Sequence, residues 1–337
     1  MESKLFLGCD ISQETFNYCL RDKSGILMEG KVDNNMKSIK TWLNQLKKDL
    51  RWNISEILFC IEHTGVYGSI LLRELSQRSL LVCMENALNI KLSLGLQRGK
   101  NDKIDAQRIA EYALRFTDRL NRWQPKREVL VRLQILIRLR ERLVKAKTDI
   151  SRFNKDAIRF LTKQESQLIL KGTKKPIETM TTQIKKVEQD ILRLIQQDEN
   201  LSRLTELITS VDGVGMVTCS AILVKTNEFK DIKSSKKFAC TAGIAPFDHS
   251  SGKSVRGKTR VSHNAHKDVK KLLHLGAVSV ISRKGVLQDY YLRKVAEGKN
   301  KMLVLNAVRN KLVSRIYAVV RDGVTYQKNY QYRLEKS

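Results

Sequence analysis

The chain has 337 residues, enough for two or three domains with buried cores. It carries 63 Lys and Arg residues against 35 Asp and Glu residues, a formal net charge of +28 at pH 7, which favours a polyanionic partner. No apolar segment approaches the roughly 20 residues that a membrane-spanning helix needs, and no signal peptide is expected at the start of the chain. These features argue against a membrane protein and predict that the polyanion is a nucleic acid.

The six cysteines indicate a reducing compartment. They lack the Cys-x-x-Cys spacing of a zinc site, and most of them fall in apolar segments. We therefore expect free, buried thiols in a cytosolic protein, without a disulfide or zinc framework. The residues are Cys9, Cys19, Cys60, Cys83, Cys219 and Cys240.

The first third of the chain alternates short apolar segments with amphipathic ones. Three strands are predicted first, and the second and third are joined by a turn that contains Gly25. Strands and helices then alternate. This order is that of an α/β RNase H-like fold, in which the first and fourth strands are neighbours. The predicted strands cover residues 5–10, 16–21, 26–32, 57–61 and 80–84, and the predicted helices cover 38–50, 66–77 and the region 102–116.

Two acidic residues close buried strands of this predicted sheet. Asp10 ends the first strand, and Glu62 ends the fourth. A single Asp at a strand end is usually a turn residue, but a carboxylate after five apolar residues is partly buried and needs a partner. Because the first and fourth strands are neighbours, we expect Asp10 and Glu62 to meet at one edge of the sheet.

A further acidic pair opens the helix predicted after Lys100. With Asp102 in or next to the first turn, Asp102 and Asp105 project from one face of the helix. The simpler interpretation makes Asp102 an N-cap and Asp105 a first-turn acid that the helix dipole favours. Together with Asp10 and Glu62, the pair indicates a divalent-cation site, since Mg²⁺ binds one or two carboxylates and leaves other positions to water and phosphate oxygens.

The middle of the chain predicts a long basic helical hairpin. Apolar residues recur every three or four positions from residue 128 to about 170, and the segment 172–176, which ends in Pro176, predicts the break between the two helices. The apolar seam favours helix pairing, while dimerisation and nucleic-acid contact both stay open. The seam residues are Val129, Leu133, Leu136, Leu139 and Leu143, followed by Met180, Ile184, Val187, Ile191 and Leu194.

Two segments of the last third suggest contacts with phosphates. Gly213 and Gly215 lie between two predicted helices, as in a helix–hairpin–helix, where backbone N–H groups approach a phosphate closely; a plain helix connection explains them equally well. Residues 242–260 predict a polar loop with paired serines and several cations. Such a loop either grips phosphates or places a serine to attack a phosphodiester, with the cations stabilising the developing charge. Amphipathic helices are predicted over residues 268–281 and 302–320.

These motifs resemble the bacterial insertion-sequence transposases and site-specific DNA invertases of the DEDD class, described as bridge-RNA-guided recombinases. The resemblance runs from Phe6 to about Val320. Residues 8–12, 62–67 and 100–106 are similar to the family's three acidic motifs. Residues 243–253 are similar to its C-terminal signature, in which the serine directly before a glycine is the nucleophile; with Gly252 as that glycine, the serine is Ser251 and not Ser250.

The resemblance implies a fold class and a domain order. We expect an α/β RNase H-like (RuvC-like) N-terminal domain over residues 1–124 and a helical coiled-coil hairpin over residues 125–202. A mostly α-helical C-terminal transposase domain is expected over residues 203–326, with a helix–hairpin–helix-like start, followed by a tail over residues 327–337.

The resemblance also implies a mechanism and partners. Mg²⁺, with Mn²⁺ as the alternative ion, is expected on Asp10, Glu62, Asp102 and Asp105, and Ser251 is expected to hold the DNA end as a phosphoserine. The implied partners are donor and target DNA, an element-encoded guide (bridge) RNA, and further copies of the chain in a homodimer or homotetramer in the bacterial cytoplasm. The candidate nucleic-acid contacts are Gly213, Gly215, Lys253, Arg256, Lys258 and Arg260.

The chain departs from the family pattern downstream of the serine. Many members carry a basic Ser-Lys-x-Gly-Asn segment where this chain has residues 262–267, so no DNA-contact residue is carried over there. Two other functions stay open: a structure-specific, Holliday-junction-like DNA nuclease that uses only the acidic metal site, and a non-catalytic nucleic-acid-binding protein. A covalent protein–DNA adduct distinguishes the first from a recombinase. Loss of activity with retained binding in Glu62→Gln excludes the second.

Overall fold

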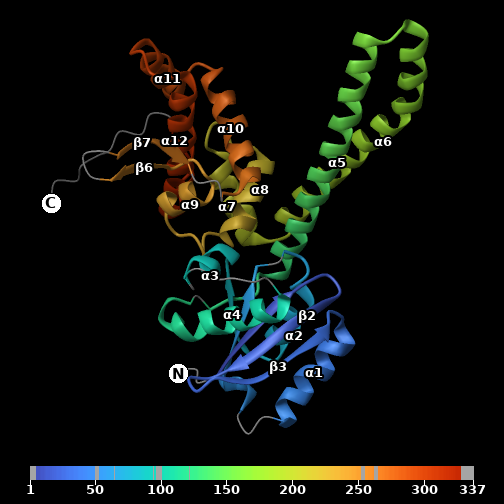
Figure 1. Cartoon of the computed structure of the whole chain (residues 1–337). Helices are drawn as coiled ribbons and strands as arrows, with labels where there is room; N and C mark the ends of the chain where they lie inside the picture. The colour runs from blue at the N-terminus through green and yellow to red at the C-terminus, as the bar shows by residue number, and fades with distance from the viewer. Residues whose placement is uncertain are drawn as a thin grey trace, which may run out of the picture. The chain divides into compact units, whose positions relative to one another are not determined.

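The structure, a computed structural model, describes residues 5–49, 53–63, 65–93, 95, 101–120, 122–251, 255–261 and 265–327. The chain divides into two compact units, Met1–Pro125 and Lys126–Ser337, which are described one after the other (Figure 1). The first unit is a mixed sheet with helices, and the second is mostly helical.

The first unit is built on a five-stranded sheet in the order β3-β2-β1-β4-β5. β1 (Leu5–Ile11), β2 (Thr15–Arg21) and β3 (Ile26–Asp33) form an antiparallel meander. β4 (Ile57–Glu62) pairs in parallel with β1, and β5 (Leu81–Glu85) pairs in parallel with β4. The prediction that the first and fourth strands are neighbours is confirmed, and this mixed sheet is compatible with the RuvC-like fold class.

Helices cover the two faces of this sheet. α1 (Met36–Asp49) and α2 (Ser69–Gln77) pack on the face that carries Leu5, Leu7 and Phe59. α3 (Ala87–Ser93) and α4 (Asp102–Arg115) pack on the opposite face against Phe6, Leu58 and Cys60. Figure 1 shows α4 lying across the strands. The short 3-10 helices η1 (Ile54–Glu56) and η2 (Thr117–Arg119) lead into β4 and out of α4.

Gly8 of β1 allows α4 to approach the sheet closely. A Cβ atom at Gly8 would lie 2.3 Å from the Ala110 nitrogen and 2.4 Å from the Ala106 oxygen. Ala106 and Ala110 pack with Cys19 of β2, the residue that is paired with Gly8. Because three small side chains and a glycine meet here, the helix backbone rests almost directly on β1.

We expect Gly8→Ala to destabilise the protein by roughly 1–3 kcal/mol or more, because the added methyl group collides with helix backbone that cannot rotate away. The measurement is urea unfolding followed by circular dichroism. Gly172→Ala is the matched control: Gly172 lies inside a helix, and no atom lies within 4 Å of the place that its Cβ would take, so this change is expected to stabilise by about 0.5–1 kcal/mol. Equal unfolding curves for Gly8→Ala and wild type would contradict the close contact.

The second unit begins with the predicted helical hairpin, formed by α5 (Glu128–Phe160) and α6 (Lys163–Gln196). Helices of 33 and 34 residues extend about 50 Å at 1.5 Å per residue. Figure 1 shows them side by side. Leu133, Ile137, Val187 and Ile191 are buried between them or at their base, but Leu139, which was predicted to lie in the seam, is 45% exposed.

The turn of the hairpin lies at Leu161 and Thr162, so the predicted break at residues 172–176 is wrong. Thr162 and Glu165 form a capping box that starts α6, with the Thr162 nitrogen donating to Glu165 Oε2 at 2.9 Å. Pro176 lies inside α6, where it removes one backbone donor and the helix continues. The Thr-x-x-Glu pattern was the stronger signal for the helix start.

Six further helices and a two-stranded sheet complete the described part of the second unit. The segment that was predicted to be a polar loop instead forms the antiparallel hairpin β6–β7, in which backbone groups bond across the pair. The remaining elements are α7 (Glu199–Thr209), α8 (Met216–Thr226), α9 (Ser235–Thr241), β6 (Pro246–Ser251), β7 (Val255–Val261), α10 (Lys267–Ile281), α11 (Val286–Ala296) and α12 (Lys301–Asp322).

The base of the helical hairpin shares one hydrophobic core with the C-terminal helices. Leu130 and Leu133 of α5 pack in the same cluster as Ile208 of α7 and Leu312 of α12. Arg127, which precedes α5, reinforces this junction: it donates to Asp198 Oδ2 at 2.7 Å and to Glu228 Oε2 at 2.9 Å. The Glu228 side chain is fully buried. In the described residues, no helix has the length and apolar character needed to span a bilayer.

Candidate acidic site and serine hairpin

Asp10 and Glu62 lie at the carboxyl ends of the neighbouring strands β1 and β4. The parallel register of the two strands runs from Leu5 opposite Ile57 to Cys9 opposite Ile61, and Asp10 and Glu62 occupy the next positions. Neighbouring strands lie about 4.8 Å apart. Both residues are half-buried, so the expected meeting of these two carboxylates at the sheet is consistent with the strand pairing.

The contacts of α4 with the sheet indicate where its first turns lie. Along β1, Phe6 packs with Ile109 and Gly8 lies under Ala106 and Ala110. Two strand residues advance about 6.6 Å and one helical turn about 5.4 Å, and Asp10 is on the same face of the strand as Gly8. In the first two turns of α4, Lys103 pairs with Glu29 of β3, and Gln107 Nε2 donates to the same carboxylate at 2.7 Å, so the start of the helix also packs over the β2–β3 part of the sheet.

Asp102 and Asp105 differ in their surroundings. Asn101 is the N-cap of α4, with its Oδ1 accepting from the Lys103 nitrogen at 3.1 Å, so the interpretation of Asp102 as an N-cap is wrong. Asp102 is exposed. The Asp105 side chain is 24% exposed and accepts from Arg108 Nη1 at 2.8 Å. Arg108 compensates the negative charge of Asp105 at the position where the sequence suggested a cation.

Glu85 is an acidic residue that the sequence analysis missed. It ends β5 and is paired with Glu62, so it lies in the same row of the sheet as Asp10. Its Oε2 accepts from the Tyr112 hydroxyl at 3.0 Å, and its Oε1 accepts from Asn89 Nδ2 at 2.8 Å. The signal was present in the sequence, since Glu85 directly follows the predicted strand 80–84 as Glu62 follows the predicted strand 57–61.

The donor set suits a hard divalent cation. Carboxylate oxygens are the ligands that Mg²⁺ and Mn²⁺ prefer, and Mg²⁺ uses one or two of them together with water and phosphate oxygens. Among the described residues, no group of three or more His, Cys, Asp or Glu side chains lies close enough together to hold a metal ion. Asp10 and Glu62, at neighbouring strand ends, and the partly buried Asp105 on α4 therefore stay candidate ligands.

The candidate nucleophile Ser251 ends β6. In the β6–β7 hairpin, Ser251 is paired with Val255 and Ser250 with Arg256, while Arg260 is opposite Phe247. Arg256, Lys258 and Arg260 thus belong to the strand beside the two serines. Lys253 and the segment 262–264 lie outside the described residues.

The two candidate phosphate-binding glycines have different surroundings. Gly213 has a φ of +84°, and a Cβ atom there would lie 2.4 Å from Val280 Cγ1 of α10, so it serves close packing. Gly215 precedes α8, and no atom lies within 4 Å of its Cβ position. Of the two, only Gly215 leaves room for a ligand beside the backbone.

The cysteines are free, and five of the six are buried, as predicted; Cys240 is half-buried. Burial raises the pKa of the Cys219 thiol to about 12. A hydrogen bond with Cys83, together with burial, raises the pKa of Cys60. Thiols with a raised pKa are poor nucleophiles and metal ligands near neutral pH, so these cysteines act as core residues.

Comparison with known proteins finds transposase families that match parts of both units. The family described as Transposase IS116/IS110/IS902 family matches residues 205–292, and the DEDD-type IS110 transposase family matches residues 7–164. The pilin gene-inverting protein of Moraxella bovis is 27% identical over 335 residues, which cover 97% of this chain and 98% of that protein. The transposase for insertion sequence element IS1111A of Coxiella burnetii is 24% identical over 260 residues, which cover 69% of this chain and 70% of that transposase.

Both units match transposases, and nearly the whole chain matches a protein that inverts a gene. The chain is therefore an enzyme that rearranges DNA. The chain carries transposase domains of the IS110/IS116/IS902 family, which confirms the resemblance to insertion-sequence transposases and DNA invertases predicted from its motifs. The DEDD-type domain supports the use of a divalent metal ion.

The pairing of Tyr112 with Glu85 generates a pH prediction. Burial, followed by the hydrogen bond to Glu85, raises the pKa of Tyr112 from 10.0 to about 12. A raised pKa in the folded state contributes stability that is complete below pH 10 and is lost as the pH rises toward 12. We expect urea unfolding of the wild type to show this loss and Tyr112→Phe to show less of it. Equal pH dependence in the two proteins would contradict the assignment.

Proposed function

We propose that this transposase cuts and rejoins DNA through a covalent phosphoserine intermediate at Ser251. The supporting observation is the parallel register of β1 and β4, in which Asp10 and Glu62 follow the last paired residues, Cys9 and Ile61. Mg²⁺, or Mn²⁺ in its place, would be held by carboxylates drawn from Asp10, Glu62, Asp102 and Asp105. An element-encoded bridge RNA would select the DNA sites, and the active form would be a homodimer or homotetramer.

The chemistry conserves the phosphodiester bond energy. The Ser251 hydroxyl oxygen attacks the scissile phosphorus, one serine O–P bond forms, and the bond to one deoxyribose oxygen breaks. The serine proton leaves to solvent or to a neighbouring base, and the departing deoxyribose oxygen gains a proton. Attack of a new DNA hydroxyl on the phosphoserine reverses these events, so rejoining needs no ATP.

The charges of the chain suit this reaction. A divalent ion would supply polarisation of the phosphate oxygens and stabilise the attacking or leaving oxygen. The chain's own cations Arg256, Lys258 and Arg260, on the strand paired with that of Ser251, are candidates for stabilising the charge that develops on the phosphate. Gly215 is the candidate for a backbone contact to a phosphate. The net charge of +28 suits a protein that binds the phosphate backbones of RNA and DNA.

We expect Ser251→Ala to abolish the covalent adduct and strand cleavage while binding is retained. Labelled DNA carrying the element ends is incubated with the protein, a divalent ion and RNA transcribed from the region flanking the element's coding sequence, then run on a denaturing gel. Ser250→Ala is the matched control and is expected to keep the adduct. An adduct that persists in Ser251→Ala but not in Ser250→Ala would assign the nucleophile to Ser250, and cleavage without any adduct would favour the nuclease alternative.

We expect Asp105→Asn to reduce cleavage to background with nearly unchanged nucleic-acid binding, because a half-buried candidate metal ligand is lost. Asp118→Asn, a neutralisation at a residue whose side chain is 75% exposed, is the control and is expected to cleave normally. The reaction is run with Mg²⁺, with Mn²⁺ and with EDTA. Cleavage that survives both Asp105→Asn and EDTA would refute the metal site.

A further inference from the structure

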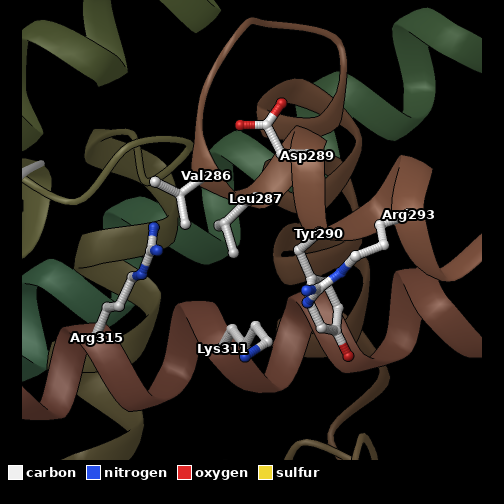
Figure 2. Close-up of a pocket in the computed structure, with 7 residues that line it drawn as sticks. All are labelled: Val286, Leu287, Asp289, Tyr290, Arg293, Lys311 and Arg315. Carbon is white, nitrogen blue, oxygen red and sulfur yellow. The ribbon is translucent and has the colours of Figure 1, made fainter.

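A groove between α11 and α12 lies in the C-terminal helices, apart from the serine hairpin in the sequence. It encloses about 430 Å³, a volume typical of a small-ligand site. Figure 2 shows side chains from both helices facing it. The lining residues are Val286, Leu287, Asp289, Tyr290 and Arg293 of α11 and Lys311 and Arg315 of α12.

The groove is positively charged. Arg293, Lys311 and Arg315 line it against one acid, Asp289, whose carboxylate points away from Lys311 and Arg315 in Figure 2. Among the described residues, no ion pair of Lys311 or Arg315 is found, whereas Arg293, after the hydrogen bond from Lys294, helps to lower the pKa of Glu297. Unlike Arg127, Lys311 and Arg315 are not neutralised by direct contact with a carboxylate of the described residues, so they favour an anionic ligand.

Aromatic rings hold two of the cations in place. The Lys311 nitrogen lies 4.5 Å from the centre of the Tyr290 ring, and the Arg315 guanidinium lies 4.8 Å from that of Tyr326. Lys311 and Arg315 are four residues apart and thus share one face of α12. Cations that are already ordered lose less entropy when an anion binds.

The groove also has an apolar wall, and further charged residues line a neighbouring cavity. Val286 is 59% exposed beside the buried Leu287. A neighbouring cavity of about 270 Å³ shares Val286, Leu287 and Arg315 and adds two cations, Arg283 and Lys284, against one acid, Asp212. An apolar and aromatic surface bordered by a row of cations matches a nucleotide strand, which alternates flat bases with phosphates.

We propose that the α11–α12 groove binds single-stranded nucleic acid, with one unpaired base against Val286 and Tyr290 and the adjoining phosphates on Arg293, Lys311 and Arg315. Base stacking on an aromatic ring beside a basic track is the usual means of holding a single strand without sequence preference. A lipid surface would need a broader exposed apolar face, and an acidic peptide would not need the aromatic wall. The site rests on the charge and shape of the groove, not on the serine or metal chemistry.

The first test removes the three cations. Full-length protein with Arg293→Gln, Lys311→Gln and Arg315→Gln is titrated with labelled single-stranded DNA, single-stranded RNA and duplex DNA, each about 12 nucleotides long, a length within the range of single-strand-binding sites. Three lost phosphate contacts should lower the slope of log affinity against log salt by about 2. The matched control is Lys37→Gln, Lys47→Gln and Lys48→Gln, which removes the same charge from exposed positions of α1.

The second test concerns the base. Tyr290→Leu should weaken binding of the single strand by about 10-fold, whereas Tyr290→Phe, which keeps the ring, should bind as the wild type does. An abasic oligonucleotide should bind the wild type more weakly and should not distinguish Tyr290→Leu from it. Circular dichroism and thermal melting confirm that each variant is folded.

The outcomes distinguish RNA from DNA as the ligand of the groove. A loss confined to RNA, confined to DNA, or common to both single strands supports the site and names its ligand. Affinities equal to those of the α1 control would overturn it, as would a loss seen only on duplex DNA or an acidic peptide that competes with a single strand for the groove. A groove variant that still forms the serine adduct separates this site from the proposed reaction, because failure of one leaves the other standing.

Discussion

The contact between the α4 backbone and Gly8 of β1 is the constraint on which the packing of the first unit depends. With no side chain at Gly8 and alanines at positions 106 and 110, the helix lies on the strand at backbone distance. This close contact fixes the position of each turn of α4 relative to the strands. Any larger residue would lift the helix, and with it the turn that contains Asp105, away from the sheet. A stability requirement of the core and the position of the candidate carboxylate Asp105 are therefore one feature of the sequence.

The second unit depends on a different kind of constraint, a buried junction. The base of the α5–α6 hairpin lies in the same core as α7 and α12, and Arg127 joins Asp198 to the fully buried Glu228. A buried charge is stable only when it is paired and hydrogen-bonded, so this cluster specifies how the first turn of α5 meets the C-terminal helices. The cations of the α11–α12 groove contrast with it, since tyrosine rings and no described carboxylates hold Lys311 and Arg315.

The differences between prediction and structure have local physical causes. Pro176 suggested the end of a helix, but a proline removes one hydrogen bond, and a helix paired along its length tolerates that loss. Thr162 and Glu165, which satisfy the free N–H groups of a helix start, were the stronger signal. The β6–β7 hairpin was predicted as a loop because its residues are polar on successive positions, so no alternation revealed the strands. Glu85 was missed although it follows a predicted apolar strand as Glu62 does, because the sequence analysis predicted a neighbour for the fourth strand and none for the fifth.

What the sequence determined by itself was the set of elements and their chemical character. The sequence showed apolar segments that end in Asp10 and Glu62, a helix that opens with Asp102 and Asp105, and a net charge of +28. These features indicated acidic residues at the ends of strands and a nucleic-acid partner, because the succession of elements along the chain and the net charge are properties of the sequence. The tertiary structure alone decided which groups meet: that Asp105 pairs with Arg108, that Glu85 is opposite Glu62, and that cations of α11 and α12 share a groove. Such contacts join residues distant along the chain or depend on side-chain conformations, and both are settled only when the elements pack.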